Sequence, residues 1–145
     1  VVIDHLRQIE QWQDALKDSE ALPALVDIDI GMGRTGVRSE QDAVAIARAL
    51  TESGAFVYKG VQAYSGMVQH INDYAERRDT YGRQLDVLER SIGVLARDGF
   101  EAEIISGGGT GTFAIDVERG LYTETQVGSY IFMDVEYNEV ELFRG

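Results

Sequence analysis

A glycine-rich stretch with two threonines is the part of the sequence best suited to bind an anion. Residues 107–112 read Gly-Gly-Gly-Thr-Gly-Thr. Successive backbone N–H groups in such a turn form a nest for an anion, and Thr110 and Thr112 add hydroxyl donors. No Gly-Lys-Ser/Thr follows, the third glycine of the dinucleotide fingerprint is missing, and no helix is expected directly afterwards. The stretch therefore predicts a site for a phosphate monoester, the alternative being a flexible turn.

Charged side chains lie close to the other glycine-rich turns. Arg34 follows Asp27 and Asp29, and we expect an ion pair or a ligand contact there, the alternative being a solvated arginine. His70 follows the end of a predicted strand and is a candidate catalytic base, the alternative being a loop histidine. His5 falls on a helix and is expected to be structural. Two widely separated histidines and no cysteine make a metal site within these residues unexpected.

Alternating strands and helices must position these groups. Hydrophobic periodicity predicts helices over residues 4–18 and 39–53 and from about 75 to 97, and strands over 24–30, 56–64, 101–106 and about 122–127. Such alternation implies a parallel sheet covered by helices. The glycine-rich turns follow strand ends, where ligands bind in α/β barrels and in open α/β sheets.

Period-two alternation predicts a polar face on three of the strands. Asp27 and Asp29 share one face of the first, Gln62 and Tyr64 lie together on the second, and the last strand places Glu124 with Gln126, Gly128 and Tyr130. Buried carboxylates are costly between helices but tolerable at a barrel mouth. We therefore expect a polar ligand in a barrel mouth, the alternative being edge-strand side chains that face water.

Composition excludes several classes of protein. The chain has 145 residues, enough for one domain, with 25 acidic and 13 basic residues and a net charge of −12. A nucleic acid or an anionic membrane needs a basic face, so neither is expected as a partner. No apolar run suits a membrane span, and the opening VVIDHLRQIE does not read as a signal peptide. We expect a cytoplasmic protein.

Four segments, in order, resemble one family of barrel enzymes. VDIDIGMGRTGV (26–37) is similar to a segment of alanine-racemase-like, fold-type III enzymes that use pyridoxal 5′-phosphate (PLP). GVQAYSGMVQH (60–70) more specifically resembles the D-threonine aldolase and D-serine dehydratase branch, which includes the β-hydroxyaspartate aldolases. SGGGTGT (106–112) and TETQVGSYIFMD (123–134) complete the set.

The resemblance implies roles for individual residues. Arg34 would contact the phenolic oxygen of PLP, Tyr64 would lie beside the cofactor, and His70 would assist a base or order its loop. Gln126 stands where racemases place an arginine at the pyridine nitrogen, and a neutral side chain there makes a shallower electron sink. Asp27 replaces a racemase lysine, which speaks against racemization. The phosphate would be held by Gly109, Thr110 and Gly111 together with Gly128 and Ser129.

Two parts of the family pattern are missing. The Schiff-base lysine of the family ends the first barrel strand, ahead of every motif seen here, and neither Lys17 nor Lys59 fits that position. The C-terminal β domain, which carries the divalent metal (Mn or Mg), is also absent. We therefore interpret residues 1–145 as an incomplete barrel of about four β/α units, inactive alone, from a longer homodimeric enzyme.

Three functions remain open for the longer protein. The first is a PLP enzyme that cleaves D-β-hydroxy-α-amino acids to glycine and an aldehyde or glyoxylate, with a D-serine dehydratase or an amino-acid racemase as variants. The second is a non-catalytic PLP carrier with the same barrel. The third is an unrelated phosphate-binding domain. Segment 60–70 favours the first, because carriers have a different, short strand end at that point.

Overall fold

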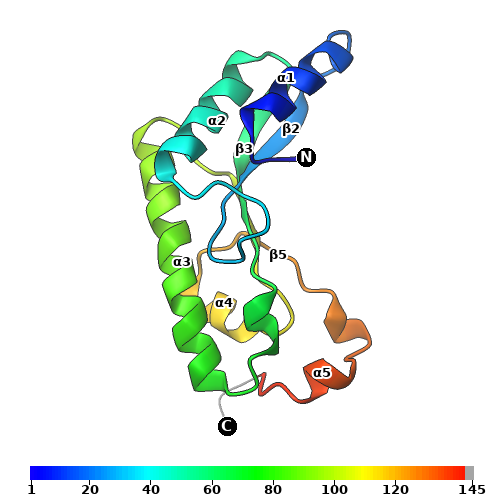
Figure 1. Ribbon diagram of the computed structural model, residues 1–145, viewed down its shortest axis with the longest axis vertical. Helices are drawn as coiled ribbons and strands as arrows, with labels where there is room; N and C mark the ends of the chain where they lie inside the picture. Colours follow the sequence, from blue (N-terminus) through cyan, green and yellow to red (C-terminus); the bar gives the residue numbers. More distant parts are fainter. Residues whose placement is uncertain (143–145) are drawn as a thin grey trace.

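A parallel sheet forms the framework of the chain. The computed structural model describes residues 1–142, with five strands that lie in the sheet in chain order (Figure 1). An order without reversal is that of a barrel segment, whereas a doubly wound sheet reverses at a switch point. The strands are β1 (Val2–Ile3), β2 (Leu22–Asp27), β3 (Phe56–Ala63), β4 (Ile104–Gly107) and β5 (Glu124–Thr125).

Helices connect successive strands and keep the sheet parallel. Side-chain caps fix where two of them begin: the Ser39 hydroxyl accepts from the backbone of Asp42 at 3.1 Å, and the Asp73 carboxylate accepts from that of Glu76 at 2.7 Å. The helices are α1 (Leu6–Ala15), α2 (Glu40–Glu52), α3 (Tyr74–Arg97), α4 (Phe113–Arg119) and α5 (Val135–Asn138), with 3₁₀ turns η1 (Met67–His70) and η2 (Ser129–Ile131).

The hydrophobic core lies between the sheet and its helices. Ile3, Val26 and Val61 are register partners on three adjacent strands, and all are buried. They belong to one buried cluster with apolar side chains of α2 and α3 (Ile46, Ala47, Leu50, Tyr81, Leu85, Leu88 and Leu95). Because burial of this face contributes most of the stabilisation, the opposite face of the sheet is left for polar groups.

Gly60 permits a close approach between β3 and β4. It has a φ of +138°, and a Cβ at this position would clash with the backbone of Ile104. The register between β2 and β3 shifts at the same level, between Ala24 and Leu25. A larger residue at position 60 would force β3 and β4 apart. The glycine therefore determines how closely these two strands lie, and with it the distance between the residues that follow them.

The fold class expected from the sequence is confirmed, with two additions. The strand β1 was not predicted, because two residues give no periodicity and its pairing with Leu25 and Val26 is non-local. The expectation that no helix follows the glycine stretch 107–112 was wrong, since α4 begins at Phe113. The predicted strand 24–30 ends earlier, at Asp27. The strand expected from Tyr122 to Val127 or beyond comprises only Glu124–Thr125, so Gln126, Gly128 and Tyr130 lie beyond it and Tyr130 belongs to η2.

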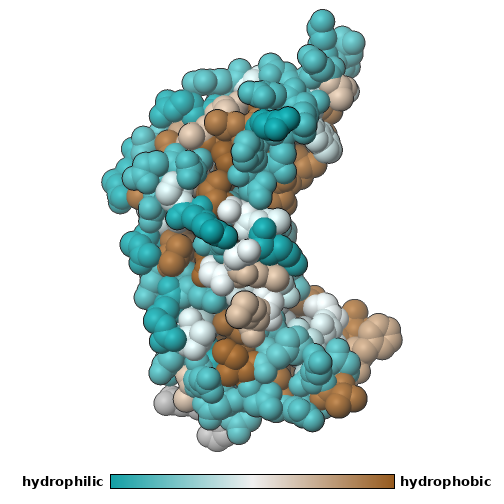
Figure 2. Space-filling view, viewed as in Figure 1, coloured by the Kyte–Doolittle hydropathy of each residue, from teal (hydrophilic) through white to brown (hydrophobic). Residues whose placement is uncertain are grey.

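The surface is uneven on the side away from α3. Figure 2 shows a concave outline there, with a projection from the segment that carries η2 and α5 at its lower end. Exposed apolar residues of that segment are Tyr130, Ile131, Phe132 and Val135. Within residues 1–142, no helix has both the length and the apolar character needed to cross a membrane.

Candidate functional site

Four neighbouring strands each contribute one polar residue to a single row. Asp27 is the register partner of Gln62, Gln62 of Ser106, and Ser106 of Glu124. Register partners in a parallel sheet point to the same face, and this row lies on the face opposite the core. Asp27 and Ser106 are buried, whereas Glu124 is exposed. The polar row predicted for three strand ends is therefore present, with Ser106 as an added member.

Hydrogen bonds join the polar row to Gln126. The Nε2 of Gln126 donates to Ser106 Oγ at 3.0 Å and to Gln62 Oε1 at 3.3 Å. Gln62 Nε2 lies 3.5 Å from Asp27 Oδ1, and Ser106 Oγ donates to Glu124 Oε1 at 2.6 Å. Because the single hydroxyl hydrogen of Ser106 goes to Glu124, Ser106 can only accept from Gln126, which fixes the amide orientation. Among residues 1–142, the Oε1 of Gln126 has no protein donor.

Arg34 and Tyr64 lie at the Asp27 end of this row. Burial raises the pKa of Asp27, and hydrogen bonds from Thr35 and Gln62 together with the charge of Arg34 only partly offset this. Burial also raises the pKa of Tyr64, which Arg34 again opposes. Arg34 is exposed, yet its charge acts on both side chains. Arg34 and Tyr64, two residues expected to contact PLP, therefore lie close enough for the charge of Arg34 to act on the Tyr64 hydroxyl.

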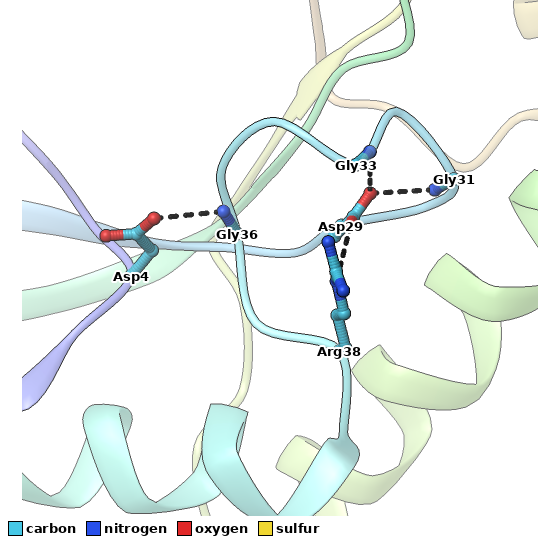
Figure 3. A network of polar contacts seen from close by, with 6 residues as sticks. All are labelled: Asp4, Asp29, Gly31, Gly33, Gly36 and Arg38. Atoms are coloured by element: carbon cyan, nitrogen blue, oxygen red, sulfur yellow. Dashed lines mark hydrogen bonds and ion pairs between the residues drawn. The ribbon is translucent and has the colours of Figure 1, made fainter.

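Asp29 organises a loop and does not point into the site. Its Oδ1 accepts from the backbone N–H of Gly31 at 3.0 Å and of Gly33 at 2.9 Å, and its Oδ2 pairs with Arg38 Nε at 3.1 Å (Figure 3). Although partial burial alone would raise the pKa of Asp29, these amides and Arg38 lower it. In the same view, Asp4 accepts from Gly36 at 3.0 Å and ties the loop to the chain after β1.

One expectation about this loop was wrong. Asp29 was expected on the inward face beside Asp27, but β2 ends at Asp27 and the chain then turns. The arginine that pairs with Asp29 is Arg38, whereas Arg34 acts on Asp27 and Tyr64 through its charge.

The glycine loop between β4 and α4 satisfies several of its own donors. The N–H of Gly109 donates to Thr112 Oγ1 at 3.0 Å, and the N–H of Gly111 donates to Gln69 Oε1 at 2.9 Å. Thr112 is fully buried and its hydroxyl donates to Asp116 Oδ2 at 2.9 Å. Thr112 therefore cannot serve as a ligand donor, contrary to expectation.

A second loop, residues 128–130, lies against the glycine loop 107–112. Tyr130 N–H donates to Thr110 Oγ1 at 3.2 Å, which joins residues 128–130 to the glycine loop. Within the described part of the chain, the backbone N–H groups of Thr110, Gly128 and Ser129 have no protein acceptor. A mainly apolar hollow of about 290 Å³ lies next to Thr110, and its lining consists of Thr110, Phe113, Val127, Tyr130 and Leu142. Free amides of two adjacent loops form an arrangement that suits an anion.

His70 is turned toward α5. Its Nδ1 lies 3.5 Å from Glu136 Oε2, and its ring centroid is 4.7 Å from that of Tyr137. Both of these contacts of His70 are with residues of α5. These contacts favour His70 as a residue that orders its loop rather than as a catalytic base.

Neither lysine of the chain lies at the polar row. Lys59 Nζ forms an ion pair with Glu103 at 2.7 Å, and Lys17 is exposed just beyond the end of α1. Among residues 1–142 there is also no cluster of three or more His, Asp or Glu side chains that could hold a metal ion.

Two buried residues behind the glycine loop, Gln69 and Asp116, were given no role from the sequence. Gln69, Thr112 and Asp116 are linked by hydrogen bonds and support the loop from its protein side. Burial raises the pKa of Asp116 to about 6, and hydrogen bonds from Thr112, Tyr81 and Gly109 limit the rise. The signal for Asp116 was weak: a Thr and an Asp four residues apart predict a contact only once α4 is recognised.

The sequence as a whole matches a described family. The match to "Alanine racemase, N-terminal domain" extends over residues 1–136. The chain belongs to the alanine racemase N-terminal domain family. The fold and the four ordered motifs are accounted for by this membership.

Relatives with assigned activities are similar to the chain over nearly all of it. A 3-hydroxy-D-aspartate aldolase of Paracoccus denitrificans (strain Pd 1222) is 33% identical over 141 residues, and a D-threonine aldolase of Arthrobacter sp is 33% identical over 142. The crystal structure of D-threonine aldolase from Filomicrobium marinum is 37% identical, with a TM-score of 0.92. Each match covers 97% of this chain but only 36–38% of the relative.

Proposed function

We propose that the full-length protein is a PLP-dependent aldolase that cleaves D-β-hydroxy-α-amino acids to glycine and an aldehyde or glyoxylate. The observation that carries the proposal is the continuous polar row at the strand ends, beside two loops with free amides. Relatives at 33–37% identity are described as D-threonine aldolase and 3-hydroxy-D-aspartate aldolase, which supports this substrate class.

The described residues fit PLP. Free N–H groups of Thr110, Gly128 and Ser129 suit its phosphate, and the glycines at 109 and 111 let the loop pack tightly behind them. Arg34 would hold the phenolic oxygen and Tyr64 would lie beside the ring, since the charge of Arg34 reaches both Asp27 and Tyr64. Gln126 would meet the ring nitrogen with its free Oε1. The lysine that binds PLP covalently would come from outside residues 1–142.

The chain's own residues would favour bond cleavage over racemization. PLP supplies, when bound, an electron sink for bonds at the α-carbon of an amino acid. Gln126 is neutral and its amide is held by Ser106 and Gln62, so it places no positive charge at the ring nitrogen. Asp27 stands where a racemase has a lysine, and its raised pKa reflects a buried carboxyl that takes up a proton readily. Tyr64 and Arg34 would orient the substrate and ring from the same side.

We propose further properties of the full-length protein. A divalent metal, Mn or Mg, would bind the β-hydroxyl group and acidify it, with ligands outside the described residues. We further propose a cytoplasmic homodimer whose partner is an amino-acid substrate, with no nucleic acid or membrane partner. The net charge of −12 supports the last point.

The experiment is product analysis with the full-length protein. Incubation with PLP and manganese or magnesium should convert D-threonine to glycine and acetaldehyde, or 3-hydroxy-D-aspartate to glycine and glyoxylate. A chelator should abolish the reaction and added metal should restore it. Release of ammonia with a 2-oxo acid would favour the dehydratase alternative. Racemized alanine as the main product without metal would contradict the proposal, and PLP binding without turnover would favour a carrier.

A further inference from the structure

Gln69 connects the end of β3 to the glycine loop 107–112. It belongs to η1, after β3, and its side chain reaches the loop between β4 and α4. Its exposed fraction is only 1%. A fully buried amide must find partners for its oxygen and its two N–H groups, so its contacts are informative about the loop it meets.

Every polar group of the Gln69 side chain has a partner. Oε1 accepts from the backbone N–H of Gly111 at 2.9 Å. Nε2 donates to the carbonyl oxygen of Ser65 at 3.1 Å and to Thr112 Oγ1 at 3.2 Å. One side chain thus joins the end of β3 to both the middle and the end of the glycine loop.

The hydrogen bonds at the Thr112 hydroxyl each have a defined donor and acceptor. Its hydroxyl oxygen accepts from the N–H of Gly109 and from Nε2 of Gln69, and its hydrogen goes to Asp116 Oδ2 at 2.9 Å, the nearer of two acceptors, since Gly109 O lies at 3.4 Å. A hydroxyl has one hydrogen and two lone pairs, so these three contacts use its full capacity. Rotation of any member would leave a buried polar group unpaired, which is costly.

The glycines of the loop fit around Gln69. A Cβ at position 109 would lie 2.6 Å from Gln69 Oε1, and a Cβ at position 111 would clash with the Gln69 backbone. Two of the loop's glycines are therefore required by contact with Gln69 on the protein side of the loop. Among residues 1–142, the N–H of Thr110, between these two glycines, has no protein acceptor.

We infer that Gln69 is a positioning residue for the phosphate group of the ligand. It holds the N–H of Gly111 directly and that of Gly109 through Thr112, which leaves the N–H of Thr110 for the phosphate together with those of Gly128 and Ser129. Gln69 therefore determines the preference for a phosphorylated over an unphosphorylated form of the same ligand. The inference rests on the proposed PLP site.

Substitutions at position 69 separate this role from charge and from general stability. Gln69→Glu keeps an acceptor for Gly111 but loses the two donors and puts a carboxylate against the Ser65 carbonyl. Gln69→Met keeps the approximate length and adds no charge, so it removes the hydrogen bonds without repelling a phosphate. Ser91→Ala is the matched control, because Ser91 is buried and bonds only within α3, to Val87 at 2.9 Å.

The test compares PLP with pyridoxal, which lacks the phosphate. Dissociation constants for both are measured by absorbance titration of the full-length protein and its variants. Both Gln69 variants should bind PLP about 10- to 100-fold more weakly and pyridoxal within about threefold of the wild type, since the loss is that of oriented donors to a charged group. Ser91→Ala should change neither the dissociation constant for PLP nor that for pyridoxal.

A second pair of variants keeps the inference testable if Gln69 variants do not fold. Thr112→Val should reduce the preference for PLP, whereas Thr112→Ser, which keeps the hydroxyl, should retain it. Equal weakening of PLP and pyridoxal, or unchanged PLP affinity, would overturn the inference. A wild-type protein that binds neither form would overturn the proposed function together with it.

Discussion

The two glycine-rich loops at strand ends use their backbone N–H groups in opposite ways. In loop 29–36, the Asp29 carboxylate accepts hydrogen bonds from the N–H groups of Gly31 and Gly33, so these two donors are used within the loop. In loop 107–112, Gln69 and Thr112 hold two amides from behind and leave that of Thr110 without a protein acceptor. Similar glycine content thus produces one structural loop and one loop able to bind an anion. The difference depends on which neighbouring acceptor reaches the loop.

The largest expected contrast between the loops concerns added methyl groups. Gly111→Ala would push a Cβ into the Gln69 backbone and should destabilise the protein by at least ~3 kcal/mol, with loss of PLP binding. Gly33→Ala meets open space at a φ of +69° and should cost about 1 kcal/mol, without effect on PLP affinity. Urea unfolding and PLP titration measure both. Similar costs for the two variants would remove the contrast.

The carboxylates behind the two loops should respond to pH in opposite directions. Burial raises the pKa of Asp116 from 3.8 to about 6, so the folded state favours its neutral form and stability falls as pH rises through this window. The pKa of Asp29 is lowered, so its contribution is present at neutral pH and is lost only on acidification below its ordinary value.

Asp116→Asn isolates the first of these effects. It should remove a pH-dependent loss of up to about 3 kcal/mol between pH 4 and pH 6. Unfolding free energies of the wild type and the variant, measured at several pH values, give the difference. A difference between the two proteins that stays constant from pH 4 to pH 6 would contradict the raised pKa.

Substitutions of Gly128 test whether the phosphate binds beside residues 128 and 129. A Cβ at this position would have no neighbour within 4 Å and the φ of Gly128 is negative, so Gly128→Asp and Gly128→Asn should both fold. The added carboxylate should weaken PLP binding about 30-fold relative to the asparagine variant, because it places a negative charge where the phosphate is expected. Cofactor content after dialysis reports the outcome. Equal retention by both variants would mean that the phosphate binds elsewhere.

The smallest effect is expected at the ion pair of loop 29–36. The Arg38 side chain is 75% exposed, so Arg38→Gln should cost less than about 1 kcal/mol and leave PLP affinity unchanged. Thermal unfolding and PLP titration check these expectations. A large fall in PLP affinity would show that this loop also contributes to the site.

The sequence predicted the elements with strong periodicity and the polar strand ends. Alternation over residues 56–64 located β3 and the inward side of Gln62, because period two is a local property. The strand β1 and the helix α4 were missed, since each is short and depends on non-local contacts. Glycine spacing located the loop 107–112 but did not predict which donors are free. That depends on Gln69, which lies 42 positions before Gly111.

The most direct test is a crystal structure of the full-length protein with bound PLP. The account predicts the phosphate group within hydrogen-bond distance of the N–H groups of Thr110 and Ser129, with Gln69 still bound to Gly111. A phosphate held by the amides of loop 29–36, or away from both loops, would contradict the account.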